Sequence, residues 1–224
     1  MNSVAAIWLT IELASITTLI LLLAGTPLAW WLARGGGALR SSIEALVAMP
    51  LILPPSVLGF YLLLAFAPQS ALGSLWQHVT GTRLAFSFSA LVIGSVIYSL
   101  PFVVQPLQAA FRQLPEGLLE AAATLGAGPT DRWLSVVLPC CGHSFLAAAS
   151  LGFAHTVGEF GVVLMIGGNI PGETQVLSIA LYDHVEALEY GLAHRLAAGL
   201  MAFSFVTLLL LYRRGNRGLG RLSA

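Results

Sequence analysis

Residues 4–33 read VAAIWLTIELASITTLILLLAGTPLAWWLA, and the only ionisable side chain in this run is that of Glu12. A helix needs about 20 mainly apolar residues to cross the hydrocarbon core of a bilayer. No basic segment precedes the run, and the run is longer than the apolar region of a cleavable signal peptide. We therefore expect it to be retained as a membrane span.

The composition of the chain points the same way. Of its 224 residues, 57% are hydrophobic and 9% are charged, whereas a soluble domain has roughly 45–50% apolar and about 25% charged residues. The mean hydropathy is +0.86. A water-exposed surface needs more ionic side chains than this, and a nucleic-acid-binding surface needs a basic patch. The composition excludes both classes, as well as a disordered chain, and predicts a polytopic protein in the lipid bilayer.

Four more apolar stretches are long enough to cross a bilayer, so we expect one all-α transmembrane domain over residues 1–224. Prolines interrupt the second and third stretches, and a proline bends a helix because it removes a backbone hydrogen bond. The sequence thus predicts a compact bundle with bent segments. The five predicted spans cover residues 4–33, 43–67, 84–110, 133–166 and 192–212, and the interrupting residues are Pro50, Pro54, Pro55, Pro101 and Pro106.

The arginines are divided unequally between the two sides of these spans. Arg83 and Arg195 fall on one side, and the other eight fall on the opposite side. Segments rich in basic residues stay in the cytoplasm. We therefore expect the N-terminus outside and the C-terminus inside. The eight arginines on the predicted cytoplasmic side are Arg34, Arg40, Arg112, Arg132, Arg213, Arg214, Arg217 and Arg221.

The chain contains no lysine, and this limits its chemistry. A nucleotide-binding P-loop needs a lysine that reaches the phosphates, so any P-loop ATPase that serves this chain must be another polypeptide. The adjacent Cys140 and Cys141 do not complete a zinc site. The histidines also lack metal-ligand spacing, and we interpret them as hydrogen-bonded polar residues: His143, His155, His184 and His194. No metal site and no cofactor is predicted in this chain.

The connection between the third and fourth predicted spans, residues 111–132, contains a short amphipathic helix by propensity, because Leu, Glu and Ala dominate its middle. Gly126 and Pro129 are expected to end this helix, and Thr130 to cap the next one. Glu116 and Glu120 make the polar face acidic. A helix that rests on lipid headgroups favours Lys and Arg there. The alternative is a docking helix received by a groove on a soluble partner.

The same region resembles the EAA signature of ABC-importer permeases. Glu120-Ala121-Ala122 is followed by Gly126 and, further on, by Leu138-Pro139. The resemblance implies that the loop over residues 111–132 is a coupling loop, whose helix inserts into a cleft of the ATPase subunit. It implies a coupling role for Glu120, Ala121, Ala122, Gly126, Leu138 and Pro139. Ala123 departs from the pattern, since many relatives carry Arg there, and one contact to the ATPase would then be missing.

Three further segments extend the resemblance to most of the chain. LPPSVLGF at residues 53–60, GEFG at 158–161 and GNIPGET at 168–174 are similar to the molybdate permease family and to the related sulfate/thiosulfate permeases. The resemblance implies a type I ABC importer bundle in the bacterial inner membrane that translocates molybdate, with sulfate/thiosulfate or tungstate as alternatives. It also implies three partners: a second copy of the chain, a cytoplasmic ABC ATPase dimer that holds ATP and magnesium, and an extracytoplasmic oxyanion-binding protein.

Two groups of residues are candidates for the transport path itself. An ionisable residue in a membrane segment is a functional candidate, and Glu159, near the outer end of the fourth span, either fixes a helix end or lines the pore mouth. Its charge would repel molybdate, so direct ligation is not expected. The candidate pore or gate residues are Pro54, Pro55, Glu159, Phe160 and Gly161. The candidate face for the binding protein, with a solvated loop as the alternative, comprises Asn169, Pro171, Gly172 and Glu173.

Two other classes of membrane protein remain open. An intramembrane enzyme would need a Ser/His pair or paired acidic residues within the spans, and the acidic residues at membrane depth are isolated. A purely structural subunit would not need a docking helix. No arginine cluster lies along a predicted span, as a tight anion site would require. We therefore expect the binding protein to select the oxyanion, and we expect no enzymatic activity of this chain alone.

Overall fold

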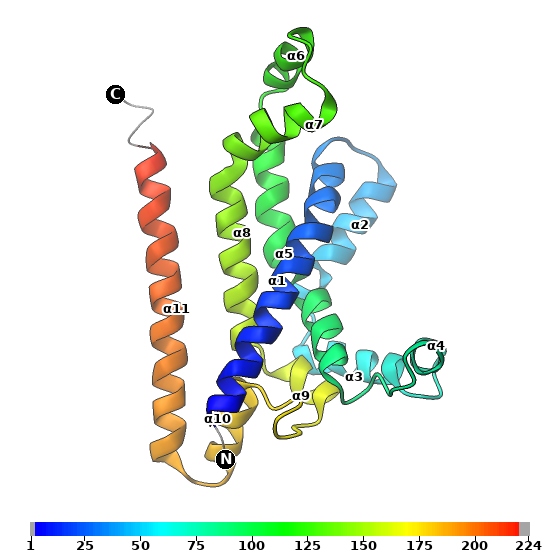
Figure 1. Ribbon diagram of the computed structural model, residues 1–224, viewed down its shortest axis with the longest axis vertical. Helices are drawn as coiled ribbons and strands as arrows, with labels where there is room; N and C mark the ends of the chain where they lie inside the picture. The colour runs from blue at the N-terminus through cyan, green and yellow to red at the C-terminus, as the bar shows by residue number, and fades with distance from the viewer. Residues whose placement is uncertain (1–2, 220–224) are drawn as a thin grey trace.

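The structure is a computed structural model that describes residues 3–219, with side chains described for residues 4–213, and this part of the chain is helical without strands. Four long helices run along the long axis of the molecule (Figure 1). They are α1 (Ser3–Ala33), α5 (Phe88–Gln113), α8 (Leu138–Gly158) and α11 (Tyr190–Leu219). Of the arginines assigned to the cytoplasmic side, Arg221 lies outside the described residues, as do the side chains of Arg214 and Arg217.

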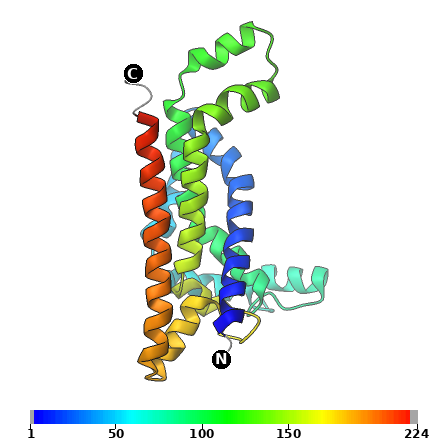
Figure 2. The same cartoon turned by 60° about the vertical axis from the view of Figure 1, so that its left-hand side comes forward.

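Shorter helices lie at the two ends of this bundle (Figures 1 and 2). At the end that carries the start of α1, they are α3 (Pro55–Phe66), α4 (Ala71–Thr80), α9 (Gly161–Gly167) and α10 (Leu177–Glu186). At the other end are α6 (Glu116–Thr124) and α7 (Pro129–Arg132), while α2 (Ala38–Ala48) runs beside α1. The chain thus places the predicted docking helix and the start of the chain at opposite ends.

The second apolar stretch, predicted as one span over residues 43–67, is not a single helix. Helix α2 and the 3₁₀ turn Met49–Leu51 meet α3 at a bend of 110°. The bend lies where Pro54 precedes Pro55, because Pro55 has no N–H to donate and its ring keeps the residue before it out of the helical conformation. Pro54 accordingly has an extended conformation, with φ −56° and ψ 135°.

The fourth stretch, predicted as one span over residues 133–166, is also divided into separate helices in the structure. Its helical part begins earlier, at Pro129, and α8 ends at Gly158. Glu159 is extended, and α9 follows as a separate helix. Thr130 does not cap α7, because Gly128 is the N-cap and Pro129 is the first helical residue. By length and composition, four helices of the described chain can cross a membrane, or five if the bent α2–α3 pair counts as one span.

The core consists of two apolar clusters arranged along the bundle. One joins α3, α5 and α9 through residues such as Phe66, Leu91 and Ile166. The other joins α1, α5 and α8 through residues such as Leu32 and Phe111. Helix α11 differs from the other long helices, because Ala193 is the one residue that it buries inside the described part of this chain. Its apolar surface therefore faces lipid or another subunit.

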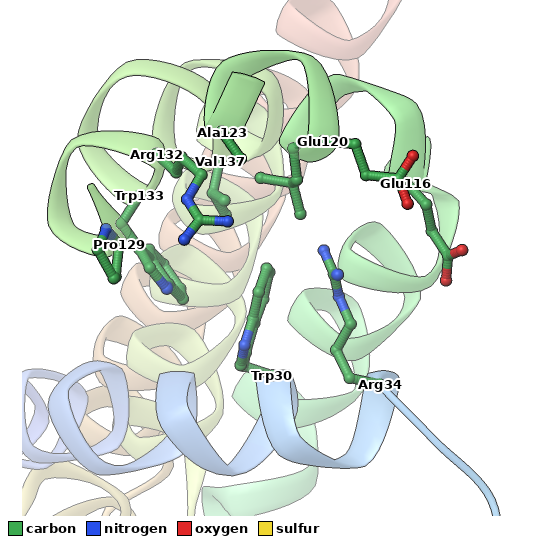
Figure 3. Close-up of a pocket in the computed structure, with 10 residues that line it drawn as sticks. Trp30, Arg34, Glu116, Glu120, Ala123, Pro129, Arg132, Trp133 and Val137 are labelled. Carbon is green, nitrogen blue, oxygen red and sulfur yellow. The ribbon is translucent and has the colours of Figure 1, made fainter. Parts of the chain in front are cut away.

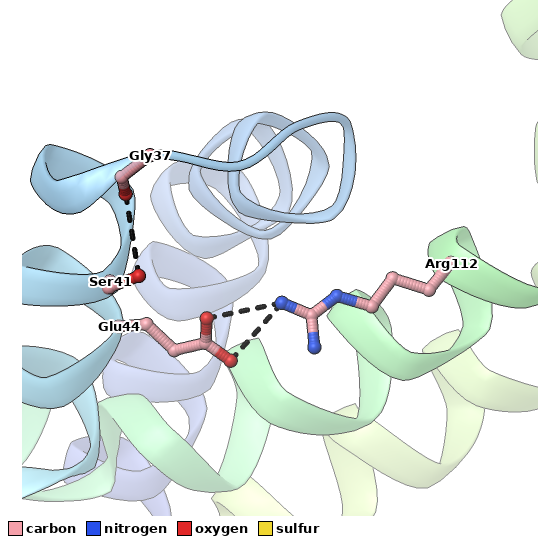
Figure 4. Close-up of polar contacts among 4 residues, drawn as sticks. All are labelled: Gly37, Ser41, Glu44 and Arg112. Carbon is pink, nitrogen blue, oxygen red and sulfur yellow. Dashed lines mark hydrogen bonds and ion pairs between the residues drawn. The ribbon is translucent and has the colours of Figure 1, made fainter.

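An ion pair joins α2 to α5 at the end of the bundle that carries α6 (Figure 4). Arg112 Nη2 lies 3.1 Å from Glu44 Oε2 and 3.2 Å from Glu44 Oε1. Both side chains are nearly half exposed, and an exposed pair of this kind contributes about 0–1 kcal/mol to stability. The pair therefore fixes how α2 lies against α5 more than it stabilises the fold.

The close packing of α5 against α8 gives a test of this architecture. A Cβ on Gly152 would lie 2.7 Å from Val103 Cγ2, whereas a Cβ on Gly142 of the same helix would meet no atom within 4 Å. We expect Gly152→Leu to lose about 1–3 kcal/mol of stability through overpacking, roughly 5 °C in melting temperature. Gly142→Leu is the control and should melt as the wild type does. Equal melting of the two variants in detergent would contradict this packing.

Candidate functional site

Helix α6 lies outside the bundle and is presented to the surroundings (Figures 1 and 2). None of its residues is buried, and the side chains of Leu118 and Leu125 are 45% and 89% exposed. Exposed leucines on a short helix are typical of a surface that packs against a partner. The prediction of a short helix at this place is confirmed, and its predicted apolar face is largely uncovered in the single chain.

The end of α6 depends on Gly126. The N–H groups of Gly126 and Ala127 donate to the carbonyls of Ala123 and Ala122, which closes the last turn. This closure requires a left-handed residue after the helix, and Gly126 has φ +88°. The predicted stop signal therefore has a structural basis, since a side chain at this position would strain the backbone.

Leu138 and Pro139 are the first residues of α8, directly after the segment predicted to be a coupling loop. The five residues Trp133–Val137 form a π-helical turn, in which the Leu138 N–H donates to the Trp133 carbonyl. Pro139 has no N–H and its ring crowds the carbonyl four residues before it, so a wider turn at this place relieves the conflict. Short π-helical segments within helices are frequently found at functional sites.

An aromatic cluster connects this junction to the core. The Trp133 ring centroid lies 4.9 Å from that of Trp30 on α1 and 5.8 Å from that of Phe111 on α5. Phe111 in turn contacts Phe145 on α8, at 5.9 Å between centroids. Aromatic contacts are specific in geometry, and this cluster joins the π-helical turn to α1 and α5 directly and to α8 through Phe111.

Four of the five candidate gate residues meet at one cavity near the opposite end of the bundle. The cavity has a volume of about 440 Å³, and Pro55, Glu159, Phe160 and Gly161 line it. Pro54 precedes them as the N-cap of α3. A Cβ on Gly161 would lie 2.6 Å from Pro55 Cβ, so the absence of a side chain at residue 161 lets the start of α9 approach the start of α3.

Glu159 occupies the break between α8 and α9 and is buried, with 5% of its surface exposed. Its carboxylate accepts a hydrogen bond from Ser95 Oγ at 3.4 Å, and its backbone carbonyl accepts one from Ser178 Oγ. Its Oε1 atom has no partner among the described residues. The residue thus ties the helix break to α5 and α10 and still presents one free oxygen.

Phe160 lies between two cavities in this region. Its ring lines the 440 Å³ cavity and a second cavity of about 320 Å³, which Ser178 and Leu200 also line. It contacts the Tyr182 ring at 5.0 Å between centroids. A movement of the Phe160 side chain would change whether the two cavities connect.

Two further residues of the gate cavity, Tyr98 and His155, were not among the predicted site residues. His155 Nδ1 lies 2.9 Å from Ser99 Oγ, and its ring stacks on Phe102 at 3.9 Å between centroids. It is hydrogen-bonded, as the sequence analysis expected of the histidines, but it also lines the cavity together with Tyr98. The available signal was its spacing of four residues from Glu159, which predicts that the two side chains lie near each other if the helix continues to residue 159.

The predicted face for the binding protein is held by a network of hydrogen bonds. Asn169 Nδ2 donates to both carboxylate oxygens of Asp183, at 2.8 and 3.0 Å, and Gln175 Nε2 donates to Asp183 Oδ2 at 2.7 Å. Pro171, Gly172 and Glu173 form the exposed turn between them. The turn is therefore a defined, exposed surface feature anchored on α10.

Comparison with known proteins identifies the protein family to which the chain belongs. Residues 25–217 match the model of the family described as "Binding-protein-dependent transport system inner membrane component". The molybdenum transport system permease protein ModB of Azotobacter vinelandii is 56% identical over 220 residues, which cover 97% of both chains. The sulfate transport system permease protein CysT of Synechocystis is 32% identical over 187 residues, which cover 84% of this chain and 65% of that protein.

Solved structures with the same fold are more distant in sequence. A bacterial ABC transporter that imports alginate superposes with a TM-score of 0.75 at 16% identity and covers 97% of this chain and 80% of the other. An inward-facing form of the MetNI methionine ABC transporter superposes with a TM-score of 0.65 at 18% identity and covers 94% of both chains. At this identity the likeness concerns the fold, which is that of ABC importer permeases.

The network at Asp183 predicts how the exposed turn responds to mutation. Asp183→Ala removes the acceptor for the amides of Asn169 and Gln175. Hydrogen bonds to a charged group contribute about 1.5–3 kcal/mol, so we expect backbone amides of residues 168–176 to exchange about ten times faster or more. The control is Glu186→Ala on the same helix, whose carboxylate pairs with Tyr182. Unchanged hydrogen exchange in Asp183→Ala would refute the role of the network.

Proposed function

Because this chain belongs to the family of binding-protein-dependent transport system inner membrane components, we propose that it is the membrane subunit of an ABC importer that carries molybdate into the cytoplasm. The full-length similarity to the Azotobacter vinelandii molybdenum permease is the observation that carries the proposal. The exposed docking helix α6, which a purely structural subunit would not need, supports it. The chain itself is not the enzyme of the complex in this proposal.

Under this proposal α6 contacts a separate ATPase on the cytoplasmic side. The exposed leucines of α6 supply an apolar surface, and Glu120, Ala121 and Ala122 belong to the same helix. Two ATPase subunits, each holding ATP and magnesium, would receive the docking helices of two copies of the chain. The unburied apolar surface of α11 leaves room for such a second copy.

The transport cycle that we infer uses the contacts described above in sequence. ATP binding draws the ATPase subunits together and displaces α6. The π-helical turn and Trp133 transmit this displacement to α1, α5 and α8. Helix α8 ends at the break that carries Glu159 and Phe160, so its movement alters the gate cavity. The two conformations differ in their affinity for the ATPase and the substrate, and this difference drives alternating access.

Substrate would enter through the end of the molecule where α9 and α10 lie, under the proposed orientation. An extracytoplasmic binding protein would dock on the exposed turn of Pro171, Gly172 and Glu173 and release the oxyanion toward Phe160. No arginine lines the gate cavity in the described chain. A dianion would therefore be held weakly there, which suits a path that must release its cargo, and selectivity would reside in the binding protein.

The coupling role of α6 predicts an uncoupled phenotype. In Gly126→Val a β-branched residue replaces the one with φ +88°, a conformation that such residues rarely adopt. We expect the end of α6 to shift, so that ATP-driven uptake falls to about a tenth or less while the ATPase still hydrolyses ATP, because strain of this kind costs about 1–3 kcal/mol. The measurement is uptake and hydrolysis by the complex in proteoliposomes.

The control for this test is Gly117→Ala in the same helix, where a Cβ meets no atom within 4 Å and φ is not positive. It should transport normally. Normal uptake by Gly126→Val at wild-type abundance would refute the coupling role of this helix end.

The identity of the oxyanion has its own test. The complete complex, reconstituted with its ATPase and binding protein, is expected to import molybdate, with tungstate as a competitor and sulfate as a poor one. Uptake of labelled molybdate in the presence of a tenfold excess of each anion measures this. Import of sulfate in preference to molybdate would instead support the sulfate/thiosulfate alternative.

A further inference from the structure

A third cavity, distinct from the two at Phe160, lies beneath α6. It has a volume of about 430 Å³ and is enclosed by the ends of α1 and α7, the π-helical turn and α6. Trp30 and Trp133 form walls of the cavity, and Ala123 of α6 lies above them (Figure 3). Leu119 of α6 also lines the cavity. It is therefore the space that separates the docking helix from the bundle.

Two arginines direct their guanidinium groups into this cavity from different elements (Figure 3). Arg34 follows α1 and lies over the Trp30 ring, with its Cζ atom 4.1 Å from the ring centroid. Arg132 is the last residue of α7. A cation held on an indole face has a fixed position, so Arg34 presents its donors to the cavity in a defined geometry.

Both guanidinium groups have unused hydrogen-bond donors. Arg34 Nη2 and Arg132 Nε are buried atoms without a hydrogen-bond partner among the described residues. Neither arginine forms an ion pair with a described acidic residue. Glu116 and Glu120 also line the cavity, but their carboxylates lie on the side far from Arg132 (Figure 3). A buried donor without a partner on a charged group is costly, and each of these two arginines carries one such donor in the wall of the cavity.

We propose that Arg34 and Arg132 form a binding site for a tetrahedral oxyanion of the phosphate class beneath the docking helix. Two guanidinium groups in one cavity are the donor set that such anions prefer. The anion is either the headgroup phosphate of an anionic phospholipid or a free oxyanion. The position of the site favours access from lipid, because tryptophans and arginines at helix ends lie at headgroup depth.

A bound oxyanion would connect elements that touch little in the empty chain. It would bridge the end of α1 to α7, and so fix the base from which α6 projects. Binding itself does not depend on the transported substrate or on the ATPase. Any effect on docking of α6 rests on the proposed function, so binding and transport are tested separately.

The test uses the full chain, purified in a maltoside detergent and stripped of lipid, and two probes at constant ionic strength. The probes are short-chain phosphatidylglycerol and sodium phosphate, followed by tryptophan fluorescence, because Trp30 and Trp133 line the site, and by native mass spectrometry. We expect one equivalent of a probe to bind. Competition between the probes distinguishes the sources: displacement of the lipid by phosphate indicates a site open to free oxyanions, and its absence indicates a lipid site.

Two sets of variants decide the proposal. Arg34→Gln combined with Arg132→Gln should weaken binding at least tenfold, whereas Arg112→Gln, which removes an arginine already paired with Glu44, should not. Ala123→Glu places a competing carboxylate in the wall of the cavity and should weaken binding to a similar extent. Its control is Thr124→Glu, which adds the same charge to the adjacent exposed position outside the cavity.

Three outcomes would overturn the proposal. These are the absence of binding of either probe to the wild type, unchanged affinity in the double arginine variant, and equal affinities of Ala123→Glu and Thr124→Glu. The Ala123→Glu comparison keeps the test decisive if the double variant does not fold, because it retains both arginines and changes only an exposed helix position.

Discussion

Every backbone N–H and C=O group inside a bilayer must find a partner within the protein, and this requirement governs the whole fold. It explains why the described chain is helical throughout, and it makes each interruption of a helix costly. The interruptions that exist are therefore informative. One lies at Pro54, directly before Pro55 begins α3 without an N–H to donate, and another lies at Glu159, whose carbonyl accepts a hydrogen bond from Ser178. A third is the π-helical turn before Pro139. It keeps its hydrogen bonds, but the donor and the acceptor are five residues apart instead of four.

These interruptions coincide with the places where function is expected. The breaks at Pro55 and Glu159 come together at the gate cavity, and the π-helical turn lies between the docking helix and α8. The regular parts of α1, α5 and α8 connect the two ends through the core and the aromatic cluster around Trp133. The irregular backbone of the described chain thus lies at the two ends of the molecule, and regular helices join these ends.

The sequence predicted some of the helices of this fold, but it did not predict all the helix breaks or the residues that line the cavities. Hydropathy located α1, α5 and α11 closely, and propensity together with Gly126 located α6, because these signals are local. Length alone did not distinguish one span from the bent α2–α3 pair or reveal where α8 ends, since each predicted span contains enough apolar residues to cross a bilayer despite the prolines or Glu159 within it. Tyr98, His155, Arg34 and Arg132 were not predicted to line a cavity, because their cavities exist only after α1, α5, α7 and α8 pack together.

The π-helical turn also sets the rotational phase of α8. Each residue of an α-helix advances the chain by about 100° around its axis, so the extra residue within Trp133–Val137 rotates everything that follows it by that amount. His155 and Glu159 face the gate cavity in that phase. A chain with one residue deleted from the turn would keep its hydropathy and its length within a residue, yet it would direct a different face of α8 toward that cavity.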